Sequence, residues 1–302
     1  MGNTSYSHQD WTTYAKTTQN KTTGQIFTRK GLDPSLDPKN ITVRESCDSV
    51  INLNSTPIAT FLDVTGSMGN MATVIAKTGL GTIMKEIVER KPVTDPHFLF
   101  GAFGDLLCDQ APLQVTQFEG GVNEMTPQLE KIFIEGGGGG NQGESPDLAW
   151  LFCATRTRID SFLKRKKKGF LFTISDEPTP HGISNDLVKQ KCGMDIERYL
   201  SPEEVLEMAS RTYECFHIFL EQGSYGKSIG AWKALMPERV LVIPDYTTIA
   251  EVIVSTLQVH AGVDKTAVAN SWSGDTSVVV ANALKDIVPG GKKDSSSGIV
   301  RF

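Results

Sequence analysis

Short apolar runs alternate along the chain with stretches of helical periodicity. Bounded apolar runs of this length are typical of buried strands, and apolar residues spaced three or four apart are typical of amphipathic helices. Core strands are predicted at 58–62, 97–103, 169–175, 213–220 and 240–243. Residues 113–118 alternate apolar and polar side chains, which predicts a half-exposed edge strand.

Helices are predicted between these strands. Their ranges are 71–90, 124–134, 147–163, 201–210, 226–236 and 247–259. The helix from 201 opens with Ser201-Pro-Glu-Glu204, which matches a capping box with proline at the first helical position. Repeated alternation of strand and helix predicts an α/β fold: a doubly wound, mostly parallel sheet with helices on both faces and one antiparallel edge strand.

The pattern divides the chain into three parts. Residues 1–57 are polar and lack periodicity, so we expect an arm that runs over the surface and contains one short edge strand near 41–46. Residues 58–260 form the α/β domain. Residues 261–302 carry one apolar stretch in a Gly-, Ser- and Lys-rich tail, so a loosely attached extension is expected there.

Composition narrows the class of protein. The 302 residues carry a net charge of -5, which argues against a nucleic-acid partner. The five cysteines are scattered and form no Cys-x-x-Cys pair, as expected in a reducing compartment. We find neither a signal peptide nor an apolar run of the roughly 20 residues that span a bilayer. A soluble, cytoplasmic protein without a membrane partner is expected.

Candidate chemistry follows the first strand. Asp63, Thr65 and Ser67 stand at alternate positions between that strand and the next helix. Open α/β sheets place ligand sites at the carboxyl ends of their strands. Oxygen donors of this kind suit hard cations such as Mg²⁺. The plainer interpretation is a helix cap, because Asp, Thr and Ser are all capping residues.

The Asp63-x-Thr65-x-Ser67 turn resembles the Asp-x-Ser-x-Ser motif of von Willebrand factor A (VWA) domains, with Thr in place of the first Ser. Asp176, at the end of the strand 169–175, is similar to the second acid of that family. The family usually adds a Thr from a Gly-rich loop. The loop here has no Thr, and Asn141, Glu144 and Ser145 are the alternatives. The resemblance covers roughly residues 58–260.

The resemblance implies a metal-ion-dependent adhesion site (MIDAS). The expected cofactor is Mg²⁺, with Mn²⁺ or Ca²⁺ as alternatives. The expected metal ligands are Asp63, Thr65, Ser67, Asn141, Ser145 and Asp176. An open coordination position on the ion would be filled by an Asp or Glu from a protein partner.

The expected function is therefore binding and not catalysis. Bacterial and phage proteins with a VWA domain often act as adaptors for MoxR-type AAA+ ATPases, so the resemblance implies such an ATPase as one partner to expect. Two alternatives stay open. One is a structural or assembly component of a phage particle or stress-response complex, and the other is a metal-dependent hydrolase.

Overall fold

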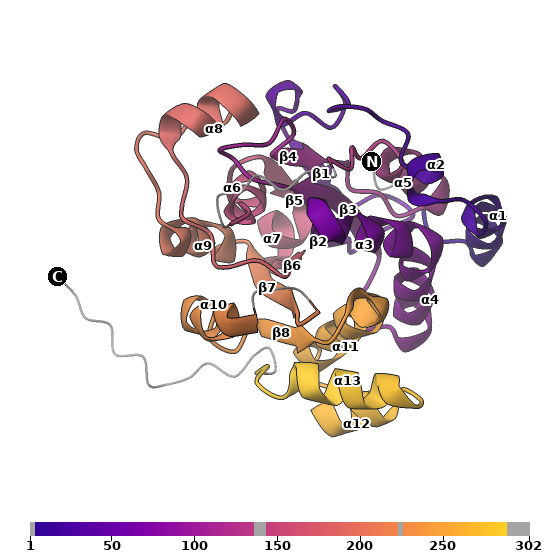
Figure 1. Ribbon diagram of the computed structural model, residues 1–302. Coiled ribbons are helices and arrows are strands. Elements are labelled where there is room, and N and C mark those ends of the chain that lie inside the picture. Colours follow the sequence, from indigo (N-terminus) through magenta and orange to yellow (C-terminus); the bar gives the residue numbers. More distant parts are fainter. Residues whose placement is uncertain (1–3, 136–142, 223–225, 289–302) are drawn as a thin grey trace.

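The computed structural model describes residues 4–135, 143–222 and 226–288. A six-stranded sheet with the strand order β4-β3-β2-β6-β7-β8 forms its centre (Figure 1). These strands are β2 (Thr56–Asp63), β3 (Pro96–Phe103), β4 (Leu113–Val115), β6 (Gly169–Ser175), β7 (Tyr213–Leu220) and β8 (Val240–Ile243). All neighbours are parallel except β4, which pairs antiparallel with β3 at the edge. The predicted α/β sheet with one antiparallel edge strand is confirmed.

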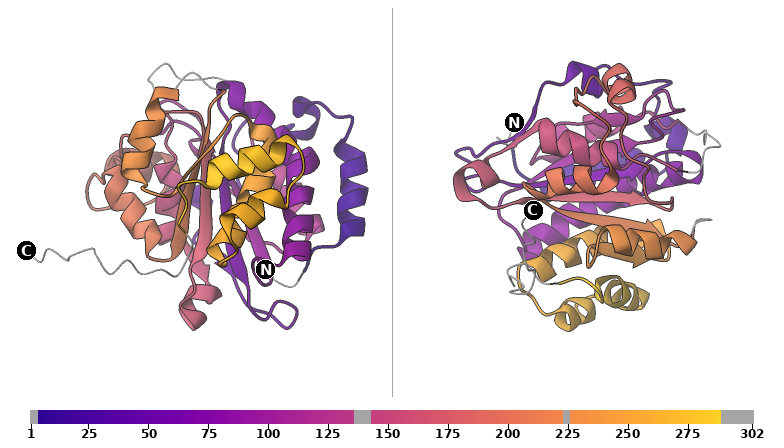
Figure 2. Two further views of the ribbon diagram at one scale, coloured as in Figure 1. Left: turned by 90° about the horizontal axis from the view of Figure 1, so that it is seen from below. Right: turned by 90° about the vertical axis from the view of Figure 1, so that its left-hand side faces the viewer.

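Helices cover both faces of this sheet, as Figure 2 shows from below. One face carries α3 (Gly69–Val74), α4 (Leu80–Arg90), α5 (Val122–Leu129), α11 (Ile249–His260), α12 (Lys265–Asn270) and α13 (Asp275–Leu284). The other carries α6 (Asp147–Thr155), α7 (Asp160–Arg165), α8 (Asn185–Cys192), α9 (Pro202–Ser210) and α10 (Ile229–Leu235). Alternate strand residues supply the two cores, since successive side chains point to opposite faces. In β2, for example, Leu62 belongs to one core and Phe61 to the other.

Short helical turns join several of these elements. They are η1 (Pro38–Asn40), η2 (Gly66–Met68), η4 (Gly226–Ser228) and η5 (Tyr246–Thr248). A π-helical segment, η3 (Ile75–Gly79), links α3 to α4 within the stretch predicted as one helix. The capping box of α9 is present, because Ser201 and Glu204 exchange side-chain-to-backbone hydrogen bonds.

The helix predicted at 147–163 is interrupted. After α6 the chain forms β5 (Thr157–Ile159), which pairs in parallel with β1 (Arg44–Ser46) in a separate two-stranded sheet. Arg156 donates hydrogen bonds to the carbonyls of Pro38, Ile41 and Gly193. These contacts, made with segments far away in the sequence, end the helix. The helical periodicity of residues 147–163 gives no sign of them. The strand predicted near 41–46 therefore exists, but it lies outside the main sheet.

The expected surface arm is packed against the domain. It contains α1 (His8–Thr18) and α2 (Thr23–Ile26), and it buries Ile26, Phe27 and Leu36. The Leu36 carbonyl accepts a hydrogen bond from the Val115 amide on the edge strand. β4 is buried and not half exposed as the alternation predicted, because the Gln114 side chain also exchanges hydrogen bonds with the backbone of Phe133.

The segment after α11 also packs on the domain as far as it is described. Val280, Ala283 and Leu284 of α13 are buried in the same core as β8 and α11. The expectation of a loosely attached extension is therefore wrong for α12 and α13. Across the described ranges no helix is both long and apolar enough to cross a membrane.

The strand order creates one switch point. From β2 the chain crosses to β3 on one side, whereas β6, β7 and β8 follow one another on the other side. In such sheets a crevice opens at the carboxyl ends of the strands where the direction of winding reverses. That point lies between β2 and β6, where Asp63 and Asp176 stand.

Candidate metal centre

The β2–α3 turn is held by Asp63. Its Oδ1 accepts hydrogen bonds from the amide and the hydroxyl of Thr65, at 2.9 and 2.7 Å. Gly66 follows with a φ of +44°, a left-handed conformation that glycine adopts without strain. Met68 then donates its amide to the Thr65 carbonyl at 2.9 Å. The motif is therefore a self-bonded turn that fixes one carboxylate oxygen and one hydroxyl at the end of the central strand.

The second oxygen of Asp63 is not used by this turn. Asp63 is fully buried, and Oδ2 has no hydrogen-bond partner among the described residues. Burial, together with the charges of Asp176 and Glu177, raises the pKa of this carboxyl to about 8 in spite of the Thr65 hydrogen bonds, which lower it. A simple capping role accounts for Oδ1 only. A buried, unpaired oxygen with a raised pKa marks a place that lacks positive charge.

Glu144 reaches the same turn from the loop before α6. Its Oε1 lies 3.0 Å from the Thr65 hydroxyl oxygen, and its Oε2 is buried with no hydrogen-bond partner among residues 4–135, 143–222 and 226–288. Burial and the neighbouring Asp63 and Asp109 raise the pKa of Glu144 to about 9. A hydroxyl carries one proton, so Thr65 can donate to only one carboxylate at a time. Both contacts of the hydroxyl are hydrogen bonds only while Asp63 or Glu144 is protonated and donates to Thr65.

Ser145 fixes the position of Glu144 instead of facing the turn. Its amide donates to the Gly104 carbonyl at 3.1 Å, and its Oγ accepts from the Leu106 amide at 3.1 Å. These two bonds tie the loop before α6 to the loop after β3. Ser145 therefore acts here as a clamp between two loops.

The third strand end contributes two acids. β6 lies beside β2 with Ile174 opposite Leu62, so Asp176 follows on the same sheet edge as Asp63. Burial raises the pKa of Asp176. Burial and Asp176 together raise the pKa of Glu177 to about 7. The Glu177 carbonyl accepts a hydrogen bond from Trp232 Nε1 at 2.9 Å, which anchors this segment to α10.

The loop after β3 completes an acidic rim. Asp105 Oδ1 accepts the Leu107 amide at 2.7 Å, and Asp109 Oδ2 accepts the Asp105 amide at 2.7 Å. Lys191 donates to the carbonyls of Leu107 and Asp109 from the opposite side. We call the group formed by Asp63, Asp105, Asp109, Glu144, Asp176 and Glu177 the acidic cluster.

The structure thus brings together Asp63, Thr65 and Asp176 of the predicted set. Glu144, one of three loop alternatives, is the one that contacts Thr65. Ser67 belongs to η2, and Asn141 lies outside the described residues. Glu177 was not predicted; its only signal in the sequence was its position directly after Asp176.

Carboxylates alone do not form a cation cage here. Within the described ranges, no group of three or more His, Cys, Asp and Glu side chains is arranged to hold a metal ion. An ion at this edge would depend on the Thr65 hydroxyl and on water as well as on the acids. That donor set is the one expected for Mg²⁺, which binds through few carboxylates and keeps several waters.

Comparison with known proteins gives only remote likenesses. No family model matches the chain, and no curated protein does. The pilus adhesin SpaC from Lactobacillus rhamnosus GG, in its open conformation, aligns at a TM-score of 0.44 and 10% identity, over 76% of this chain and 31% of that one. Proximal thread matrix protein 1 from the mussel byssus, with a zinc occupied MIDAS motif, aligns at 0.38 and 10%, over 72% and 49%. The chain spans less than half the length of either protein.

Proposed function

We propose that this chain is a protein-binding module of the VWA type that works with a divalent cation. The observation that carries the proposal is the buried Asp63 carboxylate at the switch point of the sheet, whose Oδ2 accepts no hydrogen bond from any described residue. Asp63, Thr65 and Glu144 would hold the ion, with Asp176 reaching it through water. A bound Mg²⁺ would supply positive charge and an open coordination position for an oxygen ligand.

The residues present fit such an ion. In the part of the chain that the structure describes, two buried carboxylate oxygens, Asp63 Oδ2 and Glu144 Oε2, have no hydrogen-bond partner. The pKa values of both side chains lie far above the ordinary range, which means that their ionised forms are uncompensated. A bound cation would contact the two oxygens and would also compensate the negative charge of the two ionised carboxylates. Ser67 and Asn141 stay predicted ligands.

The proposed partner is a protein that offers an Asp or Glu to the ion. Glu144 places a third carboxylate beside Asp63 and Asp176. The negative charge of the three ionised carboxylates then exceeds the positive charge of one divalent ion. A partner acid therefore needs basic neighbours that face the acidic cluster. An adaptor role for an AAA+ ATPase is a narrower form of this proposal and stays a prediction.

The loop ligand can be tested by titration calorimetry with Mg²⁺ at pH 8. We expect Glu144→Gln to weaken Mg²⁺ binding at least tenfold, because a neutral amide replaces a charged ligand. Ser145→Ala should weaken binding less, since it loosens the clamp without removing a ligand. Glu207→Gln, at a side chain that is 76% exposed, is the matched control and should bind as the wild type does. Equal affinities for Glu144→Gln and the control would remove Glu144 from the site.

The effect of the cation should depend on pH. Asp63 has a pKa of about 8 in the folded chain, above the ordinary value of 3.8. The metal-free folded state therefore binds more protons than the unfolded state between these values, and its stability falls as pH rises through that window. A cation replaces those protons. We expect Mg²⁺ to raise the melting temperature more at pH 8 than at pH 5.5, and equal shifts at both would contradict the linkage.

A further inference from the structure

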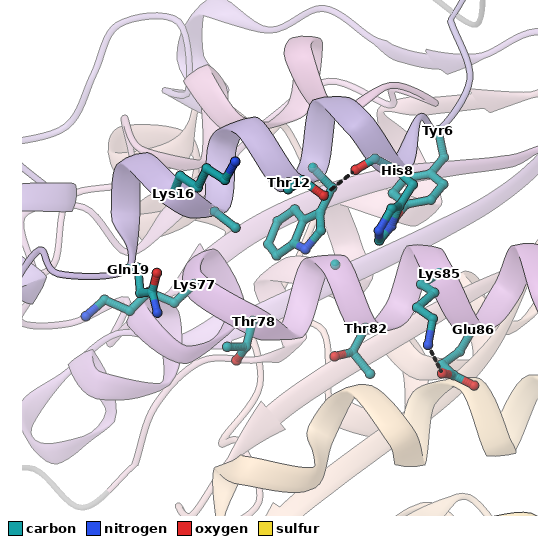
Figure 3. A pocket seen from close by; sticks show the side chains of 13 residues that line it. Tyr6, His8, Thr12, Lys16, Gln19, Lys77, Thr78, Thr82, Lys85 and Glu86 are labelled. Carbon is teal, nitrogen blue, oxygen red and sulfur yellow. Dashed lines mark hydrogen bonds and ion pairs between the residues drawn. The ribbon is translucent and has the colours of Figure 1, made fainter.

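A groove lies between α1 and the continuous helix formed by η3 and α4 (Figure 3). Its volume is about 530 Å³, within the roughly 300–1,000 Å³ typical of small-molecule sites. None of the residues that line it belongs to the acidic cluster. The groove is therefore a second candidate site, independent of the metal centre.

The floor of the groove is largely apolar. Trp11 rests directly on the backbone of α4, since a Cβ at Gly81 would come within 1.9 Å of Trp11 Cε2. The hydroxyls of Thr12 and Thr78 donate to carbonyls of their own helices, at 2.8 and 3.1 Å. These threonines therefore keep little unused hydrogen-bonding capacity. A hydrocarbon chain would find an aromatic and aliphatic surface here.

The two ends of the groove differ in charge. Lys16 and Lys77 lie at one end with Gln19, as Figure 3 shows, and neither makes an ion pair with any residue in the described ranges. Lys85, at the other end, is paired with Glu86 at 3.6 Å and is 3.8 Å from Glu89. One end is thus positive, in a chain of net charge -5, and the other is balanced.

The groove is elongated. The residues that line it on α1 and directly after it run from His8 to Gln19, a span of roughly 16 Å along a helix. An extended chain laid along this length can contact the apolar floor and the lysine end together. Lys77 and Thr78 also lie in the π-helical segment η3, and such segments are frequent at functional sites.

We infer that this groove binds a single-chain anionic amphiphile of the long-chain carboxylate class. The hydrocarbon chain lies along Trp11 and Ala15. The carboxylate lies at the end that carries Lys16 and Lys77, the two lysines without acidic partners.

The test is calorimetry of the full chain with dodecanoate below its critical micelle concentration, and with dodecanol as the uncharged probe of equal length. The wild type should bind dodecanoate in a saturable 1:1 reaction. Lys16→Glu/Lys77→Glu should weaken dodecanoate at least tenfold and leave dodecanol within about twofold. Lys30→Glu/Lys227→Glu makes the same charge change at exposed lysines outside the groove and should not alter dodecanoate binding.

A second variant tests the shape of the groove. Ala15→Phe places a ring on the floor and should weaken both probes at least tenfold, with the melting temperature as a check on folding. The inference is overturned if the wild type shows no saturable binding of dodecanoate. It is also overturned if the two charge variants lose equal affinity, or if dodecanol binds the wild type as tightly as dodecanoate does.

Discussion

Asp63→Asn is expected to abolish the response to Mg²⁺ and, at the same time, to make the metal-free protein more stable. The amide keeps an oxygen that can accept the bonds from Thr65, so the turn is preserved. The substitution removes a buried carboxylate whose ionisation is disfavoured. Each unit by which a pKa differs between the folded and the unfolded state corresponds to about 1.4 kcal/mol of stability. With a folded-state pKa of about 8, the gain at pH 8 should reach a few kcal/mol.

The measurement is a pair of melting curves at pH 8, with and without Mg²⁺. We expect the metal-free variant to melt on the order of 5 °C above the metal-free wild type, and to show no shift on adding Mg²⁺. Glu207→Gln should match the wild type in both conditions. A variant that melts below the wild type without metal would mean that the carboxylate serves the fold and not an ion.

Removal of residues 1–40 is expected to destabilise the domain severely. The deletion uncovers the core positions that contact Ile26, Phe27 and Leu36, which are 3%, 5% and 1% exposed. Burying one such side chain contributes about 1.5–3 kcal/mol, so the loss approaches the roughly 5–15 kcal/mol that separates folded from unfolded domains. It also leaves the Val115 amide on the edge strand without the Leu36 carbonyl. Unpaired edges of this kind promote aggregation.

A shorter deletion provides the control. Removing residues 1–20 takes away α1, in which Thr18 is the only residue classed as buried, and leaves Ile26 and Leu36 in place. This truncation should elute without aggregates in size-exclusion chromatography and melt within a few degrees of the full chain. If the 1–40 deletion is equally stable, the arm contributes little to the core, as its polar composition suggested.

The strands of the main sheet were predictable because each is a short apolar run whose ends are marked by polar or glycine residues. β6, β7 and β8 begin and end where the apolar pattern indicated. Their order in the sheet also placed Asp63 and Asp176 on one edge, since parallel strands present their carboxyl ends together. The coarse location of the candidate site therefore followed from local pattern and topology.

Local pattern was misleading where distant segments decide the structure. The arm is polar on average, but a few spaced residues such as Phe27 and Leu36 are enough to attach it. Arg156 ends a helix through carbonyls that lie more than 30 residues away on either side. The residues that flank each partner in the sequence do not indicate that such a contact forms.

The sequence by itself determined the alternation of strands and helices, and with it the sheet and the edge on which the acids gather. Only the tertiary structure decided that Glu144 meets Thr65 while Ser145 serves as a clamp. It also decided that Asp63 is buried with one oxygen that no described residue contacts by a hydrogen bond, and that α1 and α4 enclose a groove. The physical reason is that periodicity records which face of an element is buried. Charge compensation, by contrast, depends on distances between side chains far apart in the chain.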